Sequence, residues 1–292
     1  MVRIGVTMGD PKGIGPEITT KALMAFHKEA RFVAYAPKGL YPQVDGLEYI
    51  EPVGPNKPLN AIEQSAQDLR TGAIDAVVTA PVNKVVFEGR YPGHTELYED
   101  QLGATDVAMM MYGNRLKTVP VTTHMALRDV PEALTIDLYV RRALTVHHFF
   151  ENELEQPNPH IAFAGVNPHA GDGGLFGREE TEILEPAIEL LRQQGLNISG
   201  PVSPDTVFHQ AAMGRYDAVL CAYHDQALIP FKLLHFSDGV NVTLGLGAAR
   251  TSPDHGPAVD IAGQNIADPS SMIEAVRLAI ELGRKRSDNS SN

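Results

Sequence analysis

Three histidines each follow an apolar, β-branched run of the sequence by a few residues: His124 after 118–122, His169 after 161–166 and His224 after 218–222. In an open α/β sheet, ligands bind outside the carboxyl ends of the strands, so side chains at these places converge on one edge. Three neutral imidazoles leave a fourth position open on a divalent ion, which then polarises a bound oxygen. The spacing predicts a catalytic metal site, although a single such histidine is more often a hydrogen-bonded surface or core residue.

The neighbours of these histidines favour a site that closes around a ligand. His169 opens the glycine-rich stretch 169–174, which has the backbone freedom to fold closely around a bound group, with a simple surface turn as the alternative. His224 is followed by Asp225, a carboxylate able to orient the imidazole.

A second group of residues could bind an anion. Lys232, Asn241 and Arg250 lie in a glycine-rich segment, and a point charge beside a planar guanidinium suits phosphate oxygens. His94 and Thr95 lie where a loop enters a helix, a place whose N–H groups favour anions. Solvated salt bridges are the alternative for Lys232 and Arg250.

The sequence has no standard dinucleotide fingerprint. Neither Gly-x-Gly-x-x-Gly nor a Walker loop follows the first strand, because the stretch 9–17 fits neither template. A dense loop at 254–263 contains Asp260, which could accept hydrogen bonds from ribose hydroxyls, and a structural turn explains this loop equally well.

Composition narrows the class of protein. The 292 residues are 43% hydrophobic, enough for a substantial core. The net charge of −12 argues against a nucleic-acid partner, and no apolar stretch approaches the roughly 20 residues of a membrane span. The single Cys221, in an apolar run, is interpreted as structural, and a cytoplasmic location is expected.

Short apolar runs alternate with amphipathic segments along the chain, which predicts a mainly parallel sheet wrapped by helices. The strands are expected at 2–7, 76–79, 118–122, 161–166 and 218–222, and the helices at 17–30, 61–71, 131–152, 178–195 and 269–284. The stretch 37–58 has many Gly and Pro residues and little periodicity.

Taken together, these residues resemble the 4-hydroxythreonine-4-phosphate dehydrogenase family of vitamin B6 (pyridoxine) biosynthesis. The resemblance runs in order along nearly the whole chain, through the stretches 9–17, 93–96, 122–124, 167–171, 204–206, 223–226 and 245–263. The segments 13–17 and 255–263 are also similar, more distantly, to isocitrate and isopropylmalate dehydrogenases. Lys12, where the family more often has a small residue, and an abbreviated stretch at 37–58 are departures.

The resemblance implies a two-lobed α/β/α sandwich of the isocitrate/isopropylmalate dehydrogenase type, with the active site in a cleft between the lobes near a dimer interface. Residues 1–90 with 245–292 would form the outer, NAD-side lobe, and residues 91–244 the central lobe for metal, substrate and dimerisation. It further implies a homodimer, with His224 reaching the metal from the partner subunit.

The resemblance also assigns roles to single residues. Zinc, cobalt or magnesium would be held by the three histidines; the phosphorylated substrate by His94, Thr95, Lys232, Asn241 and Arg250; and the adenosine end of NAD by His255, Gly256 and Asp260. Asp205 would lie beside the reacting centre.

The implied reaction is the metal- and NAD-dependent oxidation, with decarboxylation, of 4-phosphohydroxy-L-threonine to 3-amino-2-oxopropyl phosphate. D-Erythronate and D-threonate 4-phosphates are alternative substrates. A metal-dependent lyase or phosphatase that does not use NAD, and a non-catalytic sugar-phosphate binding protein, are alternative functions.

Overall fold

The computed structural model describes residues 1–42 and 44–289, and its contacts divide the chain into two compact units. The first unit consists of Met1–Thr105 and Ser237–Asn292, and the second of Asp106–Phe236. His94 and Asn241 therefore belong to the first unit, whereas Lys232 belongs to the second. The functions that the sequence assigns to the two lobes stay predictions.

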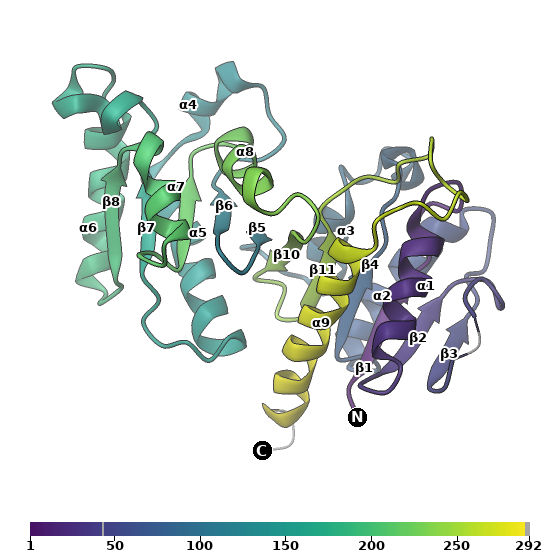
Figure 1. The fold of residues 1–292 in the computed structure, drawn as a ribbon. Helices are drawn as coiled ribbons and strands as arrows, with labels where there is room; N and C mark the ends of the chain where they lie inside the picture. Colours follow the sequence, from purple (N-terminus) through teal and green to yellow (C-terminus); the bar gives the residue numbers. More distant parts are fainter. Residues whose placement is uncertain (43, 290–292) are drawn as a thin grey trace. The chain divides into compact units, whose positions relative to one another are not determined.

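The first unit is a twisted sheet between two layers of helices (Figure 1). Its strands lie in the order β3-β2-β1-β4-β11-β10, all parallel except β10, which is antiparallel to β11. Helix α1 packs on α9, and α2 packs on α3. The elements are β1 (Arg3–Thr7), α1 (Gly15–Phe26), β2 (Arg31–Tyr35), β3 (Leu47–Ile50), α2 (Lys57–Thr71), β4 (Ala76–Thr79), η1 (Lys84–Phe87), α3 (His94–Leu102), β10 (Val240–Leu244), β11 (Ala249–Pro253) and α9 (Ser270–Asn289).

The second unit repeats this plan, with strand order β5-β6-β9-β7-β8 and only β5 antiparallel to its neighbour. Its strands are β5 (Ala108–Tyr112), β6 (Lys117–Pro120), β7 (Ile161–Ala164), β8 (Ile198–Val202) and β9 (Ala218–Cys221). Its helices are η2 (Leu127–Asp129), α4 (Val130–Ala133), α5 (Ile136–His148), η3 (Phe149–Glu153), η4 (Pro168–Gly174), η5 (Glu180–Leu184), α6 (Glu185–Gln193), α7 (Pro204–Ala212) and α8 (His224–Leu234).

The apolar runs of β7 and β9 are buried along their whole length. Val219 and Cys221 join a cluster with residues of α7 and α8, while Leu220 between them is also fully buried. Strands covered on both faces read as continuous apolar runs, as parallel α/β layers require. Burial raises the pKa of the Cys221 thiol, which supports its structural interpretation. The predicted α/β sandwich is confirmed.

The prediction of one helix over 131–152 is wrong. Helix α4 ends at Ala133, Leu134 and Thr135 are extended, and α5 begins at Ile136. The Thr135 hydroxyl accepts a hydrogen bond from the Leu138 N–H at 3.1 Å, the contact of an N-terminal cap. A threonine inside the amphipathic pattern therefore starts a new helix instead of continuing the first.

The stretch 37–58 is less irregular than expected. It contains β3, which pairs in parallel with β2, and the first residues of α2. The Asn56 side chain accepts from the Leu59 N–H at 3.2 Å and caps α2. Residue 43 lies outside the described residues.

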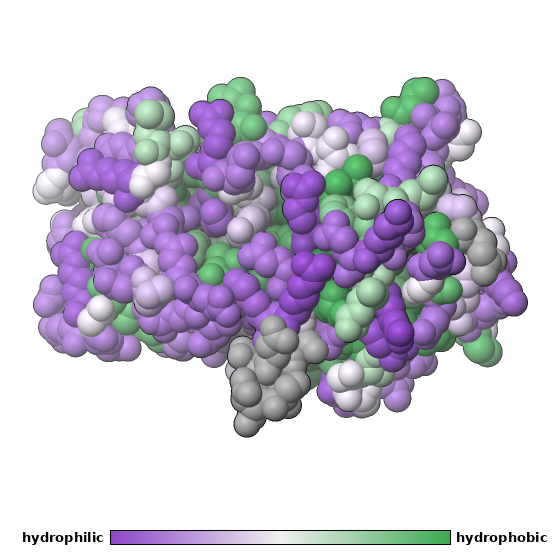
Figure 2. All heavy atoms as spheres, turned by 60° about the horizontal axis from the view of Figure 1, so that its bottom comes forward, coloured by the Kyte–Doolittle hydropathy of each residue, from purple (hydrophilic) through white to green (hydrophobic). Residues whose placement is uncertain are grey.

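One face of the molecule is predominantly polar. Hydrophilic residues cover most of the face drawn in Figure 2, in line with a charged fraction of 21% and a net charge of −12. Within 1–42 and 44–289, none of the helices has the length and apolar character needed to cross a bilayer.

Candidate active site

The three histidines follow three neighbouring parallel strands of the second unit. Strand β9 lies between β6 and β7, and His124, His224 and His169 follow the carboxyl ends of β6, β9 and β7 respectively. The pairing of β6 and β9 continues past the strands, because the Val121 N–H donates to the Cys221 carbonyl at 2.7 Å. The Thr122 hydroxyl donates to the Ala222 carbonyl at the same distance. Sheet topology thus brings all three loops to one edge.

His124 and His224 approach each other closely, with ring centroids 5.7 Å apart. Two imidazoles bound to one tetrahedral zinc have centroids about 5 Å apart, because the Zn–N bond is about 2 Å. His224 is the first residue of α8, and its Nδ1 lies 2.9 Å from the Asp225 carboxylate. That contact leaves Nε2 free to bind a metal. This pair therefore fits a shared ion within one chain, and the expectation that His224 comes from a partner subunit stays a prediction.

His169 lies outside this pair. It is exposed and begins a run of left-handed residues, with φ of 53° at His169, 54° at Ala170 and 45° at Asp172. In the part of the chain that the structure describes, no three His, Cys, Asp or Glu side chains are gathered in a metal-binding cluster. The structure therefore brings two of the three predicted ligands together and places the third on a neighbouring strand end.

Asp205 also belongs to the second unit. It is exposed in the first turn of α7, where its carboxylate accepts a hydrogen bond from the Ser203 hydroxyl at 2.6 Å. Its role beside a reacting centre stays a prediction.

The first unit contains a buried guanidinium that is bound by hydroxyl groups. Arg250 on β11 is 3% exposed, and it donates to Thr79 Oγ1 at 2.6 Å and to Thr243 Oγ1 at 2.9 Å. Burial lowers the pKa of Arg250 to about 10, which still leaves it charged at neutral pH. The Glu96 carboxylate raises this pKa less than burial lowers it, and the hydrogen-bond partners are neutral hydroxyls, so the site favours an anion. Sequence reasoning missed Thr79 and Thr243. Thr79 is the last residue of the strand predicted at 76–79, and Thr243 lies on β10, the strand next to that of Arg250.

His94 and Asn241 add unsatisfied polar atoms to this unit. Among the described residues, His94 Nε2 and Asn241 Oδ1 are buried without a hydrogen-bond partner. Burial, and next the charge of Arg250, lower the pKa of His94 and keep its ring neutral. Asn241 precedes Thr243 by two residues on β10, and Thr243 is paired with Arg250 on β11. The side chains of Asn241 and Arg250 therefore lie on the same face of the sheet. Buried polar atoms of this kind are suited to a ligand.

The other two predicted phosphate contacts differ in their setting. Thr95 is half-buried in the first turn of α3, where Gly93 provides no side-chain cap for the N–H groups. Lys232 is half-buried on α8 in the second unit, 5.9 Å from the Phe236 ring centre.

The predicted cofactor loop is held against the start of α1. The Ile14 N–H donates to the Pro257 carbonyl at 2.8 Å, and a Cβ added to Gly13 would lie 2.7 Å from that oxygen. Glu17 accepts from the Gly263 N–H at 2.9 Å. His255 Nδ1 contacts the Gly256 carbonyl at 2.9 Å, whereas Asp260 is exposed. The segments 13–17 and 255–263, which are far apart in the sequence, thus form one surface.

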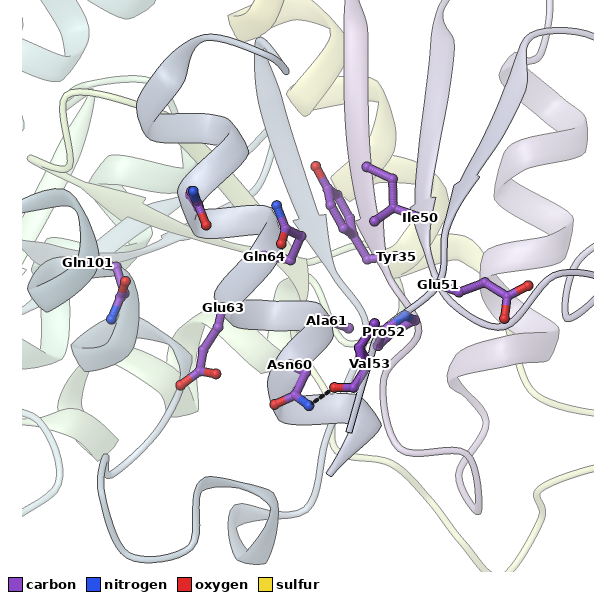
Figure 3. A pocket seen from close by; sticks show the side chains of 11 residues that line it. Tyr35, Ile50, Glu51, Pro52, Val53, Asn60, Ala61, Glu63, Gln64 and Gln101 are labelled. Atoms are coloured by element: carbon purple, nitrogen blue, oxygen red, sulfur yellow. Dashed lines mark hydrogen bonds between the residues drawn. The ribbon is translucent and has the colours of Figure 1, made fainter. Parts of the chain in front are cut away.

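A pocket of about 380 Å³ lies elsewhere in the first unit, beside β2, β3 and α2 (Figure 3). Its lining includes the amides of Asn60, Gln64, Gln67 and Gln101 and no lysine or arginine. None of the predicted site residues lines it, and its lack of cations makes it unsuited to a phosphate.

Comparison with known proteins identifies the chain's relatives. A 4-hydroxythreonine-4-phosphate dehydrogenase of Desulfosudis oleivorans is 41% identical, with 95% of each chain covered. A Salmonella typhi protein provisionally named D-threonate 4-phosphate dehydrogenase is 39% identical, over 96% of this chain and 98% of the relative. These dehydrogenase names confirm the predicted oxidoreductase class.

Solved structures agree with this relationship. The crystal structure of 4-hydroxythreonine-4-phosphate dehydrogenase from Klebsiella pneumoniae matches with a TM-score of 0.84 and 36% identity, over 97% of this chain and 98% of that one. Isocitrate dehydrogenase from Methylococcus capsulatus shares the fold alone, at a TM-score of 0.55 and 16% identity, over 100% of this chain and 89% of that one. The family model described as "Pyridoxal phosphate biosynthetic protein PdxA" matches residues 50–279. The chain therefore belongs to the PdxA family of pyridoxal phosphate biosynthetic proteins.

Proposed function

We propose that this chain oxidises 4-phosphohydroxy-L-threonine with NAD, assisted by a divalent metal, and releases CO2 and 3-amino-2-oxopropyl phosphate. The names of its relatives and the pair His124–His224, with ring centroids 5.7 Å apart, support this proposal. The pair is the observation that carries it, because two converging imidazoles on neighbouring strand ends are a metal-binding arrangement.

The residues predicted from the sequence would divide the work. Arg250, His94, Thr95, Asn241 and Lys232 would bind the phosphate and so orient the hydroxyl that reacts. His124, His224 and His169 would hold zinc, cobalt or magnesium, which when bound supplies the Lewis acidity that lowers the pKa of that hydroxyl. The surface formed by His255, Gly256 and Asp260 with the start of α1 would bind NAD, and Asp205 would lie near the reacting carbon.

The proposal is tested by measuring NADH formation from its absorbance, with the purified chain, NAD and 4-phosphohydroxy-L-threonine, before and after a chelator removes the metal. We expect turnover that is lost on chelation and restored by zinc, cobalt or magnesium. Turnover that is insensitive to chelation in both wild type and His224→Ala would contradict the metal site.

D-Threonate 4-phosphate is the second candidate substrate, because the Salmonella typhi relative carries that name. It shares the phosphate and the vicinal hydroxyl but lacks the amine. Comparing kcat/KM for the threonine derivative with kcat/KM for D-threonate and D-erythronate 4-phosphates decides which of them this chain prefers.

We also propose a cytoplasmic homodimer formed through the second unit. The large apolar side chains of α8 and its end are strongly exposed, with Ile229 at 69%, Leu233 at 85% and Phe236 at 82%. Leu127 and Leu175, in the loops after β6 and β7, are exposed by 65% and 70%. Large apolar side chains that are exposed along one helix favour association with another protein surface.

A further inference from the structure

The loop that carries His169 is built around a buried carboxylate that the proposed reaction does not use. Glu180, the first residue of η5, is 2% exposed. Its Oε1 accepts from the Val166 N–H at 2.8 Å and from the Asn167 N–H at 2.7 Å. Its Oε2 accepts from Asn167 Nδ2 at 2.9 Å. Three donors from the end of β7 thus converge on one side chain.

The same carboxylate supports the left-handed turn that follows. A Cβ added to Gly171 would lie 2.7 Å from Glu180 Oε2, so the backbone of the loop passes directly over the carboxylate. His169, Ala170 and Asp172 are non-glycine residues with positive φ. Such backbone conformations are unfavourable for residues that carry a side chain, and they persist only where the surroundings impose them.

A second contact joins this loop to the strand end that carries His224. Gln226 Nε2 donates to the Gly165 carbonyl at 2.7 Å, and Gln226 Oε1 accepts from the Ala222 N–H at 2.7 Å. The ends of β7 and β9 are therefore bridged by one amide. The loop after β7, which Glu180 holds, is therefore also held relative to His224.

We propose that Glu180 is a positioning residue, which holds the loop 166–174 so that His169 can complete the metal site begun by His124 and His224. This inference rests on the proposed function for its metal. Glutamine cannot replace the carboxylate fully, because its amide NH2 would face the NH2 of Asn167 where an acceptor is needed.

The experiment compares wild type, Glu180→Gln and Glu182→Gln as apoprotein, by zinc titration against a chromophoric chelator and by amide hydrogen exchange of the segment 166–176. Glu182 is the matched control, since it lies on the same turn, is exposed and pairs with Arg178 at 2.7 Å. We expect Glu180→Gln to weaken zinc binding about 10- to 100-fold and to speed exchange in this segment, whereas Glu182→Gln should leave both readouts nearly unchanged.

Asn167→Ala provides a second variant if Glu180→Gln does not fold, because it removes the side-chain donor to Glu180, and with it a 2.7 Å hydrogen bond to Glu179, and leaves the Glu180 carboxylate in place. Wild-type zinc affinity in Glu180→Gln, or in Asn167→Ala where that variant replaces it, would overturn the positioning role. Absence of zinc binding by wild type itself would defeat the proposed metal site. If wild type binds no zinc, unchanged hydrogen exchange of 166–176 in Glu180→Gln would overturn the loop-holding role as well. Faster exchange in that variant would show that Glu180 holds the loop for a structural reason only.

Discussion

At the scale of single residues, Arg250 is the one lysine or arginine that is buried among the described residues. Its guanidinium is buried between two threonine hydroxyls, so an anion bound there would lose little strength to solvent screening. Lysine at this position would keep the charge but lose the planar fork.

Arg250→Lys should raise KM for the phosphorylated substrate about 10- to 100-fold, as expected for loss of a charged hydrogen bond of about 1.5–3 kcal/mol. The KM for NAD should stay near the wild-type value. Steady-state kinetics measures both constants, with the exposed Arg70→Ala as the control. Equal changes in the two constants would argue against a phosphate contact.

His94 makes a prediction about pH. Its pKa is lowered in the folded chain, mainly by burial, so the unfolded chain binds a proton near pH 6 that the folded chain does not. Stability contributed by the neutral ring is therefore present above the unfolded pKa of about 6.5 and is lost as the pH falls below it. The limiting slope is about 1.4 kcal/mol per pH unit.

Urea unfolding at pH values above and below this pKa should show that wild type loses more free energy of unfolding on acidification than His94→Gln. Other groups titrate in both proteins, so the difference between the two curves isolates His94. Parallel curves would show that the imidazole is as readily protonated in the folded chain as in the unfolded one.

At the scale of elements, the site depends on loops that are packed against each other. Gly13, before α1, has no room for a side chain, because an added Cβ would lie 2.7 Å from the Pro257 carbonyl. A methyl group there must separate the start of α1 from the predicted cofactor loop.

Gly13→Ala should therefore raise KM for NAD at least several-fold while changing KM for the phosphorylated substrate little. Overpacking of this kind typically costs about 1–3 kcal/mol. Fluorescence titration with NADH checks the binding step directly. Unaltered NADH affinity in a correctly folded variant would place the cofactor elsewhere.

At the scale of the whole molecule, the exposed apolar side chains of α8 predict an interface between copies of the chain. Leu233→Lys places a charge in a surface that the dimer would bury, so sedimentation velocity should detect monomers where wild type forms dimers. Met213→Lys, at an exposed methionine that directly follows α7, is the matched control. A monomeric wild type would remove the proposed homodimer.

Much of the fold was predictable because burial on both faces of a parallel strand imposes a continuous apolar run. The strands at β4, β7 and β9 were found this way, and the family prediction is confirmed. Strand β11 was not found, because Arg250 and Ser252 interrupt its pattern with buried polar residues. Strand β8 was not found either, because it contains Gly200 and Pro201, which are typical of turns.

By itself the sequence determined the class of the fold, the placing of three histidines after strand-forming runs, and the family. Those features are built from local patterns, since each run or motif depends on residue types within a few positions of one another. Only the tertiary structure decided that His124 meets His224, that hydroxyls surround Arg250, and that Glu180 lies beneath the loop of His169. His124 and His224 lie far apart in the chain, as do Arg250 and Thr79, and Glu180 meets residues from the end of the preceding strand. Their distances exist only after the sheet has set which strands are neighbours.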